Sequence, residues 1–330
     1  MTTNIAIIGL GEIGTSLAMA FMEQGDTFSV TGLDYLRSAE RRAEENHWVG
    51  KIEHNLFDAV EDADTVILAV PADQTRGILE LIGHSLKENV FVIDCCPNKC
   101  AASAWARQYM DHPENYIGLW FGINPQYLGL KSDGGKTAAP DFFRGGTLFI
   151  AAERDTAEDT IKLASGLADM LEMECSFVEP VELDVMISAS YHLPVLASHA
   201  LMRCVIRHPG WLDGKKAAGK VFCAAAEQVN IKPDREEAGF SLIESREHSV
   251  RLLNEYISEL KTLRDMLQNS EENELRTLIG ENEKALDQWL IDYRKSNLES
   301  EHQSHTVNVS ASEILSQTFF GGLLRRKPKN

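Results

Sequence analysis

The sequence predicts an α/β fold, in which a doubly wound parallel sheet is followed by an all-helical C-terminal domain. Two observations support this prediction. Between residues 1 and 178, apolar strand-like segments alternate with helical segments, as in sheets built from parallel strands and crossover helices. After residue 179, apolar residues recur at helical spacing, and strand-like segments are absent up to the tail. We therefore expect a sheet domain at 1–178, a helical domain at 179–295, and a flexible linker and tail at 296–330.

The first strand and the turn that follows it carry the most specific motif. Residues 5–8 are all apolar, as in a strand buried on both faces, and Gly9-Leu10-Gly11-Glu12-Ile13-Gly14 comes next. In this pattern Gly9 permits a tight turn, Gly11 lets the backbone approach a pyrophosphate, and Gly14 lets helix and strand pack closely. The N–H groups at the start of the next helix, aligned with its dipole, attract an anion. The motif predicts a dinucleotide site, and a glycine turn without a ligand is the alternative.

An acidic residue follows the second strand at the distance that dinucleotide-binding domains use. Residues 28–33 end in Asp34, about 20 residues after Gly14, where a carboxylate accepts hydrogen bonds from the adenosine ribose hydroxyls. The same carboxylate repels a 2′-phosphate, so we expect NAD as the cofactor rather than NADP. Arg37 and Arg41 lie just beyond Asp34 and soften this preference. Strand, glycine turn, helix, strand and acid together predict a Rossmann-type domain.

The remaining segments of the sheet domain follow in chain order. Strands are expected at 65–71, 89–94, 116–119, 147–151 and 175–178, and helices at 37–46, 58–64 and 156–171. A glycine-rich, polar stretch at 131–146 separates two of these strands. Ligands bind at the carboxyl edge of parallel sheets, so we expect Ala69, Val70, Pro71 and Asp94, at the ends of two strands, to line the cofactor site.

The C-terminal half has the periodicity of helices. Residues 182–205 form one helical segment, which Pro194 should kink. Two apolar stripes, at 250–267 and 275–293, predict a helical hairpin. Such stripes usually fill a core, and in a helical second domain they also bury subunit interfaces, so we expect a homodimer formed through this domain. The polar residues 296–312 predict a loose linker.

Charge and composition bear on the class of partner. The 330-residue chain has a net charge of −18, which argues against nucleic acid, because phosphate contacts need a basic surface. We find no apolar run of membrane-spanning length, and the first strand begins within four residues, which leaves no room for a signal peptide. Six cysteines without a CxxC pair favour a reducing cytoplasm and packing thiols rather than a metal site. We expect the basic tail at 318–327 to be frayed, with docking on anionic lipid or on the protein itself as the alternatives.

Four segments resemble the prephenate/arogenate dehydrogenase family. They are the glycine turn and helix at 9–18, the strand at 63–71, Phe142-Phe143-Arg144-Gly145, and Ser190-Tyr191-His192-Leu193-Pro194. The resemblance implies a nucleotide-binding domain, a helical dimerisation domain and an active site between them. It also implies the oxidative decarboxylation of a cyclohexadienol, a carboxylate-bearing ring alcohol, on the route to tyrosine.

The sequence departs from this family where the family places its catalytic groups. The histidine of the family's His-Pro segment corresponds to Asn124, and the serine after its fourth strand corresponds to Pro97. The second histidine of its helix motif corresponds to Val195, and its substrate-binding arginine aligns with Glu227. Asparagine can donate a hydrogen bond to a hydroxyl group but cannot take its proton.

Three residues are therefore candidates for catalysis. The resemblance makes His192 the surviving acid–base group, although an isolated histidine on an apolar helix is often a core residue. Asn124 would donate to the substrate hydroxyl group. Lys99 follows the carboxyl end of a strand, where it would hold a substrate carboxylate or orient the nicotinamide side, with a solvated lysine as the alternative.

Three functions stay open from the sequence. The first is oxidation of prephenate or arogenate with substitute residues. The second is a dehydrogenase for another small hydroxy acid or ring alcohol. The third is an NAD-binding family member without catalytic activity.

Overall fold

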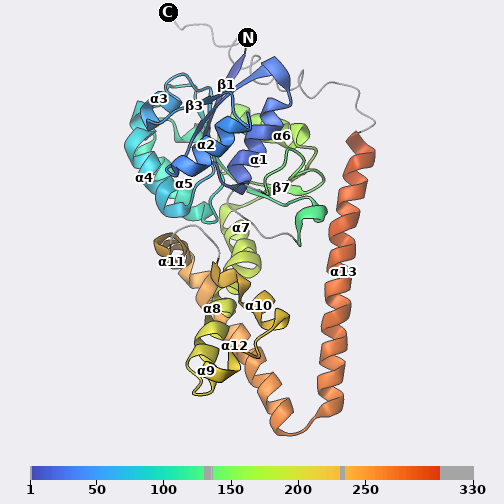
Figure 1. The fold of residues 1–330 in the computed structure, drawn as a ribbon. Coiled ribbons are helices and arrows are strands. Elements are labelled where there is room, and N and C mark those ends of the chain that lie inside the picture. Colours follow the sequence, from blue (N-terminus) through green and yellow to red (C-terminus); the bar gives the residue numbers. More distant parts are fainter. Residues whose placement is uncertain (1, 130–134, 136, 231–234, 305–330) are drawn as a thin grey trace, which may run out of the picture. The chain divides into compact units, whose positions relative to one another are not determined.

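The computed structural model describes residues 2–129, 135, 137–230 and 235–304 (Figure 1). The chain forms two compact units. The first, here called the sheet unit, comprises residues 1–183 and 285–330, and the second, the helical unit, comprises 184–284. The described residues from 285 to 304 thus group with the sheet, although they follow the helical unit in the chain.

The sheet unit is built on eight strands in the order β3-β2-β1-β4-β5-β6-β7-β8. Their bounds are β1 (Thr3–Ile8), β2 (Phe28–Leu33), β3 (Lys51–Ile52), β4 (Thr65–Leu68), β5 (Phe91–Asp94), β6 (Tyr116–Phe121), β7 (Thr147–Ala151) and β8 (Glu174–Val178). Neighbouring strands pair in parallel except β6 and β7, which are antiparallel. The doubly wound α/β fold predicted from the sequence is confirmed.

Helices cover both faces of this sheet. The helices of the sheet unit are α1 (Glu12–Met22), α2 (Arg37–Glu45), α3 (Leu56–Val60), α4 (Ala72–Ile82), α5 (Lys99–Tyr109) and α6 (Glu158–Met170), with 3₁₀ turns at Gly25–Thr27, Gly83–Ser85, Pro113–Asn115 and Pro125–Tyr127. Helices α1, α2 and α6 share one face, and α4 and α5 pack together on the other (Figure 1). Alternate strand residues such as Ile5 and Ile7 point to the α1 face and are at most 1% exposed.

Several strand limits differ from those predicted. Strand β4 ends at Leu68 rather than at Pro71, because Pro71 lacks an N–H group for the ladder and instead forms the N-cap of α4. Strand β5 begins at Phe91, two residues later than expected. The two-residue edge strand β3 (Lys51–Ile52) was not predicted, since so short a segment carries no periodicity.

The parallel strands bring the candidate residues to one edge. Strands β1, β4, β5 and β6 point the same way, so the turns after their carboxyl ends leave the sheet on the same side. The glycine turn follows β1, residues 69–71 follow β4, and Asp94 ends β5. Asn124 follows β6 by a few residues. This carboxyl edge is where ligands bind in open parallel sheets.

A continuous helical segment from Pro180 to Ile206 leads into the helical unit. It consists of α7 (Pro180–Ile187), the π-helical turn η5 (Ser188–His192) and α8 (Leu193–Ile206). The expected interruption at Pro194 takes the form of this π turn, whose wider spacing accommodates a residue that cannot donate a backbone hydrogen bond.

The same segment corrects the expectation that the chain holds no long apolar run. Among the described residues, Pro180–Ile206 is the one helix whose length and composition would suffice to cross a membrane, with a mean hydropathy of 1.2. Its buried polar residues Ser188, His192 and Ser198 are hydrogen-bonded within the helical unit. In its most apolar 18-residue window, 28% is buried.

The remaining helices complete the chain. They are α9 (Trp211–Gly214), α10 (Lys220–Ala226), α11 (Arg235–Glu244), α12 (Arg246–Gln268) and α13 (Glu272–Ser304), with a 3₁₀ turn at Glu227–Asn230. A turn at 269–271 joins α12 to α13, as predicted. Residues 296–304, expected as a loose linker, continue α13, because neither glycine nor proline interrupts them. The rest of that linker and the basic tail at 318–327 lie outside the described residues.

Candidate active site

The glycine turn after β1 has the geometry that the motif predicts. Gly9 has a φ of +98°, which favours glycine, and a Cβ there would overlap the carbonyl oxygen of Ala69. A Cβ on Gly14 would in turn overlap the carbonyl oxygen of Gly9. These two glycines let β1, the start of α1 and the turn after β4 lie against one another.

Gly11 differs from these two glycines. A Cβ added there would meet no described heavy atom within 4 Å, so the fold itself does not require glycine at this position. Gly11 is also the N-cap of α1 and, having no side chain, does not itself cap that helix. Uncapped N–H groups beside open space form a cradle for an anion, so these residues fit the pyrophosphate of a dinucleotide.

A segment far along the chain lies against this cradle. Gly135, with a φ of +83°, approaches closely enough that a Cβ would lie 3.0 Å from the Leu10 carbonyl oxygen. The Thr137 hydroxyl group donates to the Glu12 carboxylate at the first turn of α1. The Ala139 N–H donates to the Ser16 hydroxyl group at 3.2 Å. The sequence marked this stretch only as glycine-rich and polar.

Asp34 lies beside the glycine turn. Its Oδ2 accepts from the Leu10 N–H at 2.7 Å, and its Oδ1 accepts from the Leu36 N–H at 2.8 Å. Burial raises the pKa of Asp34, an effect that these two hydrogen bonds oppose. Arg37, one of the two arginines expected to soften the preference for NAD, is held 2.8 Å from buried Glu40.

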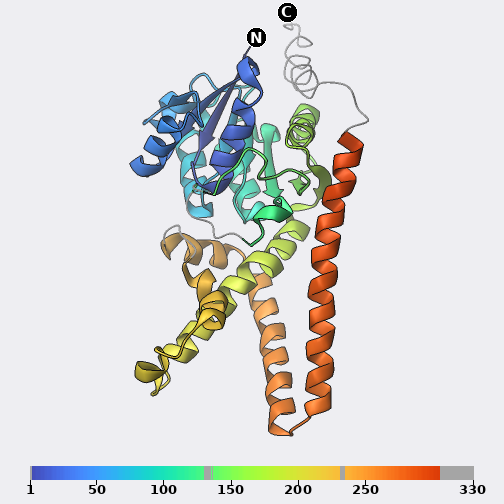
Figure 2. The same ribbon diagram turned by 45° about the vertical axis from the view of Figure 1, so that its right-hand side comes forward.

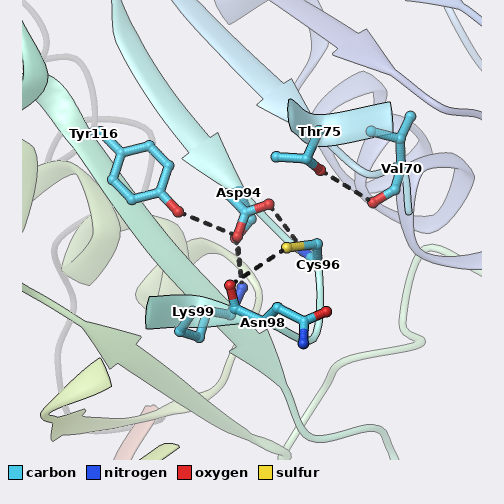
Figure 3. Close-up of polar contacts among 7 residues, drawn as sticks. All are labelled: Val70, Thr75, Asp94, Cys96, Asn98, Lys99 and Tyr116. Carbon is cyan, nitrogen blue, oxygen red and sulfur yellow. Dashed lines mark hydrogen bonds and ion pairs between the residues drawn. The ribbon is translucent and has the colours of Figure 1, made fainter. Parts of the chain in front are cut away.

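Asp94 and Lys99 form a buried ion pair at the end of β5 (Figure 3). Their side chains are 0% and 1% exposed, and Lys99 Nζ lies 2.9 Å from Asp94 Oδ2. Lys99 also donates to the Asp94 carbonyl oxygen, and the Tyr116 hydroxyl group donates to Oδ2 at 3.3 Å. The Cys96 N–H donates to Oδ1 at 3.0 Å. The carboxylate therefore ties β6, α5 and the turn at 95–98 together.

This pairing changes the role expected of Lys99. Burial, the largest single effect, lowers the pKa of Lys99, but the charge of Asp94, the neighbouring Cys95 and Cys96 and the hydrogen bond to Asp94 together outweigh it, so the pKa is raised. The ammonium group thus stays charged and is directed at Asp94 rather than at solvent. Burial likewise raises the pKa of Cys95 to about 12, which keeps this thiol neutral and unsuited to nucleophilic chemistry.

Asn124 is engaged within its own loop. Its Oδ1 accepts from the Gln126 N–H at 3.1 Å, and its Nδ2 donates to the Asp141 carbonyl oxygen at 3.2 Å. The Asp141 carboxylate also accepts from the Tyr127 hydroxyl group at 2.6 Å. Burial, followed by Asp141, raises the pKa of Tyr127 to about 12. The family's histidine position is thus occupied by a neutral amide whose direction is fixed by the loop.

His192 lies in the π turn of the helical unit and is 2% exposed. Its Nε2 lies 3.1 Å from the Ser241 hydroxyl group on α11, and its Nδ1 lies 3.4 Å from the Ser188 hydroxyl group. Burial lowers its pKa from 6.5 to about 4, so the imidazole is neutral at physiological pH. A neutral imidazole can accept a proton, which a charged one cannot.

The lowered pKa of His192 predicts a pH dependence of stability. The unfolded chain binds a proton at a higher pH than the folded chain, so stability is lost as the pH falls from about 6.5 to about 4. Relative to His192→Gln, the wild type should lose up to about 3 kcal/mol over this window, as read from urea unfolding at each pH. Parallel stability curves for the two proteins would contradict this.

The predicted site residues thus fall into two groups. His192 belongs to the helical unit. The carboxyl edge of the sheet unit holds the others, namely Gly9 to Gly14, Asp34, residues 69–71, Asp94 and Asn124. Within the described residues, no group of three or more histidine, cysteine, aspartate or glutamate residues could hold a metal ion.

Comparison with known proteins supports this description. Residues 4–98 match a family model described as NADP oxidoreductase, coenzyme F420-dependent. The chain is 21% identical to the cyclohexadienyl dehydrogenase of Zymomonas mobilis over 290 residues, which are 86% of this chain and 94% of that protein.

Two solved structures are similar over most of the chain. The prephenate dehydrogenase of Aquifex aeolicus, in complex with hydroxyphenyl propionate and NAD⁺, has a TM-score of 0.75 at 18% identity and covers 87% of this chain and 98% of its own. Synechocystis arogenate dehydrogenase has a TM-score of 0.66 at 20% identity and covers 87% of this chain and 100% of its own. This chain has the fold of a prephenate dehydrogenase. The resemblance inferred from the motifs is confirmed.

The comparisons show an NAD(P)-binding oxidoreductase fold. Asn124 and Pro97 stand where the resemblance implies a histidine and a serine. The burial of Lys99 was not predicted from the sequence. A signal for that burial was present, since Asp94, five residues earlier, ends a fully apolar strand.

Proposed function

We propose that this protein is an NAD-dependent dehydrogenase of the prephenate/arogenate type, which oxidatively decarboxylates a carboxylate-bearing ring alcohol. The observation that carries the proposal is the open, uncapped cradle at Gly11 with Asp34 beside it. The fold adds support, since a solved structure with that fold holds NAD⁺ and an aromatic ring acid.

Each candidate residue has a defined task in this proposal. The N–H groups at the start of α1 bind the pyrophosphate, and Asp34 accepts from the ribose hydroxyl groups. Ala69, Val70, Pro71 and the turn after Asp94 border the rest of the cofactor. When bound, NAD supplies the hydride acceptor. Asn124 donates a hydrogen bond to the substrate hydroxyl group. His192, whose imidazole is neutral, is the candidate base that the resemblance implies.

The catalytic assignments have a direct kinetic test. His192→Ala should lower turnover of the ring substrate by at least about tenfold, the lower range for loss of a positioned base. Asn124→His should preserve or raise that turnover, because it adds a base where the family has one. Unchanged turnover in His192→Ala would remove this residue from the mechanism.

The cofactor preference depends on Asp34. Asp34→Ser removes the charge that repels a 2′-phosphate, so its ratio of NADP to NAD affinity should rise by at least about tenfold, given roughly 1.4 kcal/mol per decade. Arg37→Ser is the matched control, because Glu40 already pairs with this arginine. Titration of both cofactors measures the effect. Wild-type protein that binds NADP as tightly as NAD would contradict the assignment.

A homodimer is part of the proposal. The longest helices expose large apolar side chains, namely Val250, Ile257, Leu260 and Leu267 on α12, and Ile279, Leu286, Trp289 and Ile291 on α13. An exposed apolar surface of this kind is commonly an interface, and a second copy of the chain is the occupant that we propose.

Light scattering tests this assembly. Wild-type protein at micromolar concentration should have the mass of a dimer. Ile257→Glu combined with Leu260→Glu should have the mass of a monomer, since each side chain is nearly half exposed and is replaced by a charge. The control, Lys261→Glu on the same helix, should stay dimeric. A monomeric wild type would rule the dimer out.

The cytoplasm is the compartment that we propose for this enzyme. All six cysteines are free in the structure, which suits a reducing environment. The functional alternative is an NAD-binding protein without catalytic activity. One observation favours it: both the Oδ1 and the Nδ2 atoms of Asn124 are hydrogen-bonded within the loop of this residue, which leaves the amide less available to a substrate. Tight NAD binding without turnover of any ring alcohol or hydroxy acid would favour that alternative.

A further inference from the structure

The end of α13 contacts the segment that leads to Asn124. Tyr293 donates its hydroxyl hydrogen to the Ile123 carbonyl oxygen at 2.9 Å, and the same hydroxyl oxygen accepts from the Ile123 N–H at 3.1 Å. One side chain therefore satisfies both backbone groups of a residue 170 positions earlier in the chain. Both residues belong to the sheet unit, and the C-terminal part of α13 lies beside that unit (Figure 2).

The sheet cannot supply these two hydrogen bonds. Successive residues of an extended strand direct their N–H and C=O groups to opposite sides. The N–H groups of Gly122 and Asn124 donate toward the β7 side, to the carbonyl oxygens of Thr147 and Phe142. The N–H and C=O groups of Ile123 therefore point to the side on which β5 lies. Strand β5 ends at Asp94, which pairs with Gly118, so it does not extend far enough to reach Ile123. Tyr293 takes the place of a strand beyond the end of β5.

The contact is built into the packing of α13. Tyr293 packs beside Trp289, one helical turn earlier, with ring centroids 5.8 Å apart and ring planes tilted by 57°. A Cβ on Gly122 would lie 3.6 Å from the Tyr293 hydroxyl oxygen, so the backbone before Ile123 also lies close to the tyrosine. Burial raises the pKa of Tyr293, so its hydroxyl group keeps the proton that it donates.

We propose that Tyr293 is a positioning residue, which holds the backbone at Ile123 so that the Asn124 amide keeps its place at the carboxyl edge of the sheet. This inference rests on the proposed function, because it assigns Asn124 to the substrate. Through Tyr293, the C-terminal part of α13 then contributes to positioning the site in the sheet unit. The hydrogen bonds of Asn124 to Gln126 and Asp141 fix the amide from the other side.

The consequence of losing this contact can be stated in kinetic terms. Tyr293→Phe keeps the ring and its packing but leaves the Ile123 N–H and C=O groups without their partner. A small shift of a substrate-orienting group lowers kcat by about 10-fold to 100-fold. The cradle at Gly11 is not touched, so the KM for NAD should stay unchanged.

The experiment has a structural arm and a kinetic arm. Hydrogen exchange is followed in the peptide that spans 120–128 for wild type, Tyr293→Phe and Tyr109→Phe, the last making the same change at the end of α5. Turnover is compared in wild type, Tyr293→Phe, Asn124→Ala and the double variant. We expect faster exchange only in Tyr293→Phe. We also expect the kcat loss of Tyr293→Phe to vanish in the Asn124→Ala background, since coupled residues are not additive.

Each arm can overturn the inference separately. Unchanged exchange in a folded Tyr293→Phe would show that the tyrosine does not hold this backbone. Faster exchange with unchanged kcat, or a kcat loss that adds fully to that of Asn124→Ala, would reduce Tyr293 to a structural role. If the wild type turns over no ring alcohol, the proposed function fails and the assignment of Asn124 fails with it. The exchange arm then still reports separately whether Tyr293 holds the backbone.

Discussion

Lys99→Met should destabilise the sheet unit by about 3–5 kcal/mol, the usual cost of removing one partner from a buried ion pair. The reason is that Asp94 is fully buried, and removing Lys99 takes away its charged partner and leaves the hydrogen bonds from Tyr116 and the Cys96 N–H. Equilibrium unfolding in urea measures the loss as a lower midpoint at an unchanged slope.

Two further variants separate the buried pair from a general effect of losing a lysine. Lys162→Met removes an exposed lysine that pairs with Glu158 at 2.7 Å on the surface of α6, and its midpoint should barely move. Lys99→Met combined with Asp94→Leu removes both charges and should recover part of the lost stability, because no buried charge is left unpaired. If Lys99→Met were as stable as Lys162→Met, the ion pair would not hold this edge together.

Gly14→Ala should reduce the stability of the fold, whereas Gly11→Ala should leave stability nearly unchanged and reduce the affinity for NAD. A Cβ on Gly14 would overlap the Gly9 carbonyl oxygen, so Gly14→Ala should destabilise the fold by roughly 1–3 kcal/mol or prevent folding, as overpacking does. A Cβ on Gly11 meets open space, so Gly11→Ala should fold with nearly the melting temperature of the wild type. That methyl group would occupy the space left for a pyrophosphate, so NAD affinity should fall at least about tenfold, or roughly 1.4 kcal/mol.

Calorimetry of unfolding and titration with NAD together decide between the roles of the two glycines. Gly239→Ala is a suitable control, because a Cβ there also meets no atom within 4 Å and the residue lies in the helical unit. It should leave NAD affinity unchanged. Gly11→Ala that binds NAD normally would mean that the cradle at the start of α1 is not the pyrophosphate site.

The parts of the fold that were predictable are those whose signal is local. Strand β2 has the expected limits, because alternation and the acid at its end mark it within a few residues. The roles of Gly9 and Gly14 could be predicted because, in this motif, each glycine permits a close backbone approach within one strand–turn–helix unit. The helical stripes of α12 and α13 were equally local, since an apolar period of 3.6 residues is visible along the chain itself.

The parts that could not be predicted depend on contacts between distant residues. Tyr293 appeared in the sequence only as one member of an apolar stripe, because nothing local indicates that its hydroxyl group meets Ile123. Lys99 allowed a solvated or a substrate-binding interpretation, since burial of a charge depends on how elements distant in the chain pack around it. The contact of Thr137 with Glu12 was equally hidden, as it spans 125 positions.

We propose that this chain, with Asn124 and Pro97 where the resemblance implies a histidine and a serine, oxidises a ring alcohol with NAD. The most direct measurement mixes the purified protein with NAD and either prephenate or arogenate and follows the absorbance of reduced cofactor. We predict reduced cofactor in step with aromatic product, and a lower rate in His192→Ala. Tight NAD binding without reduced cofactor from either ring substrate, in wild type and in Asn124→His combined with Pro97→Ser, would contradict the claim.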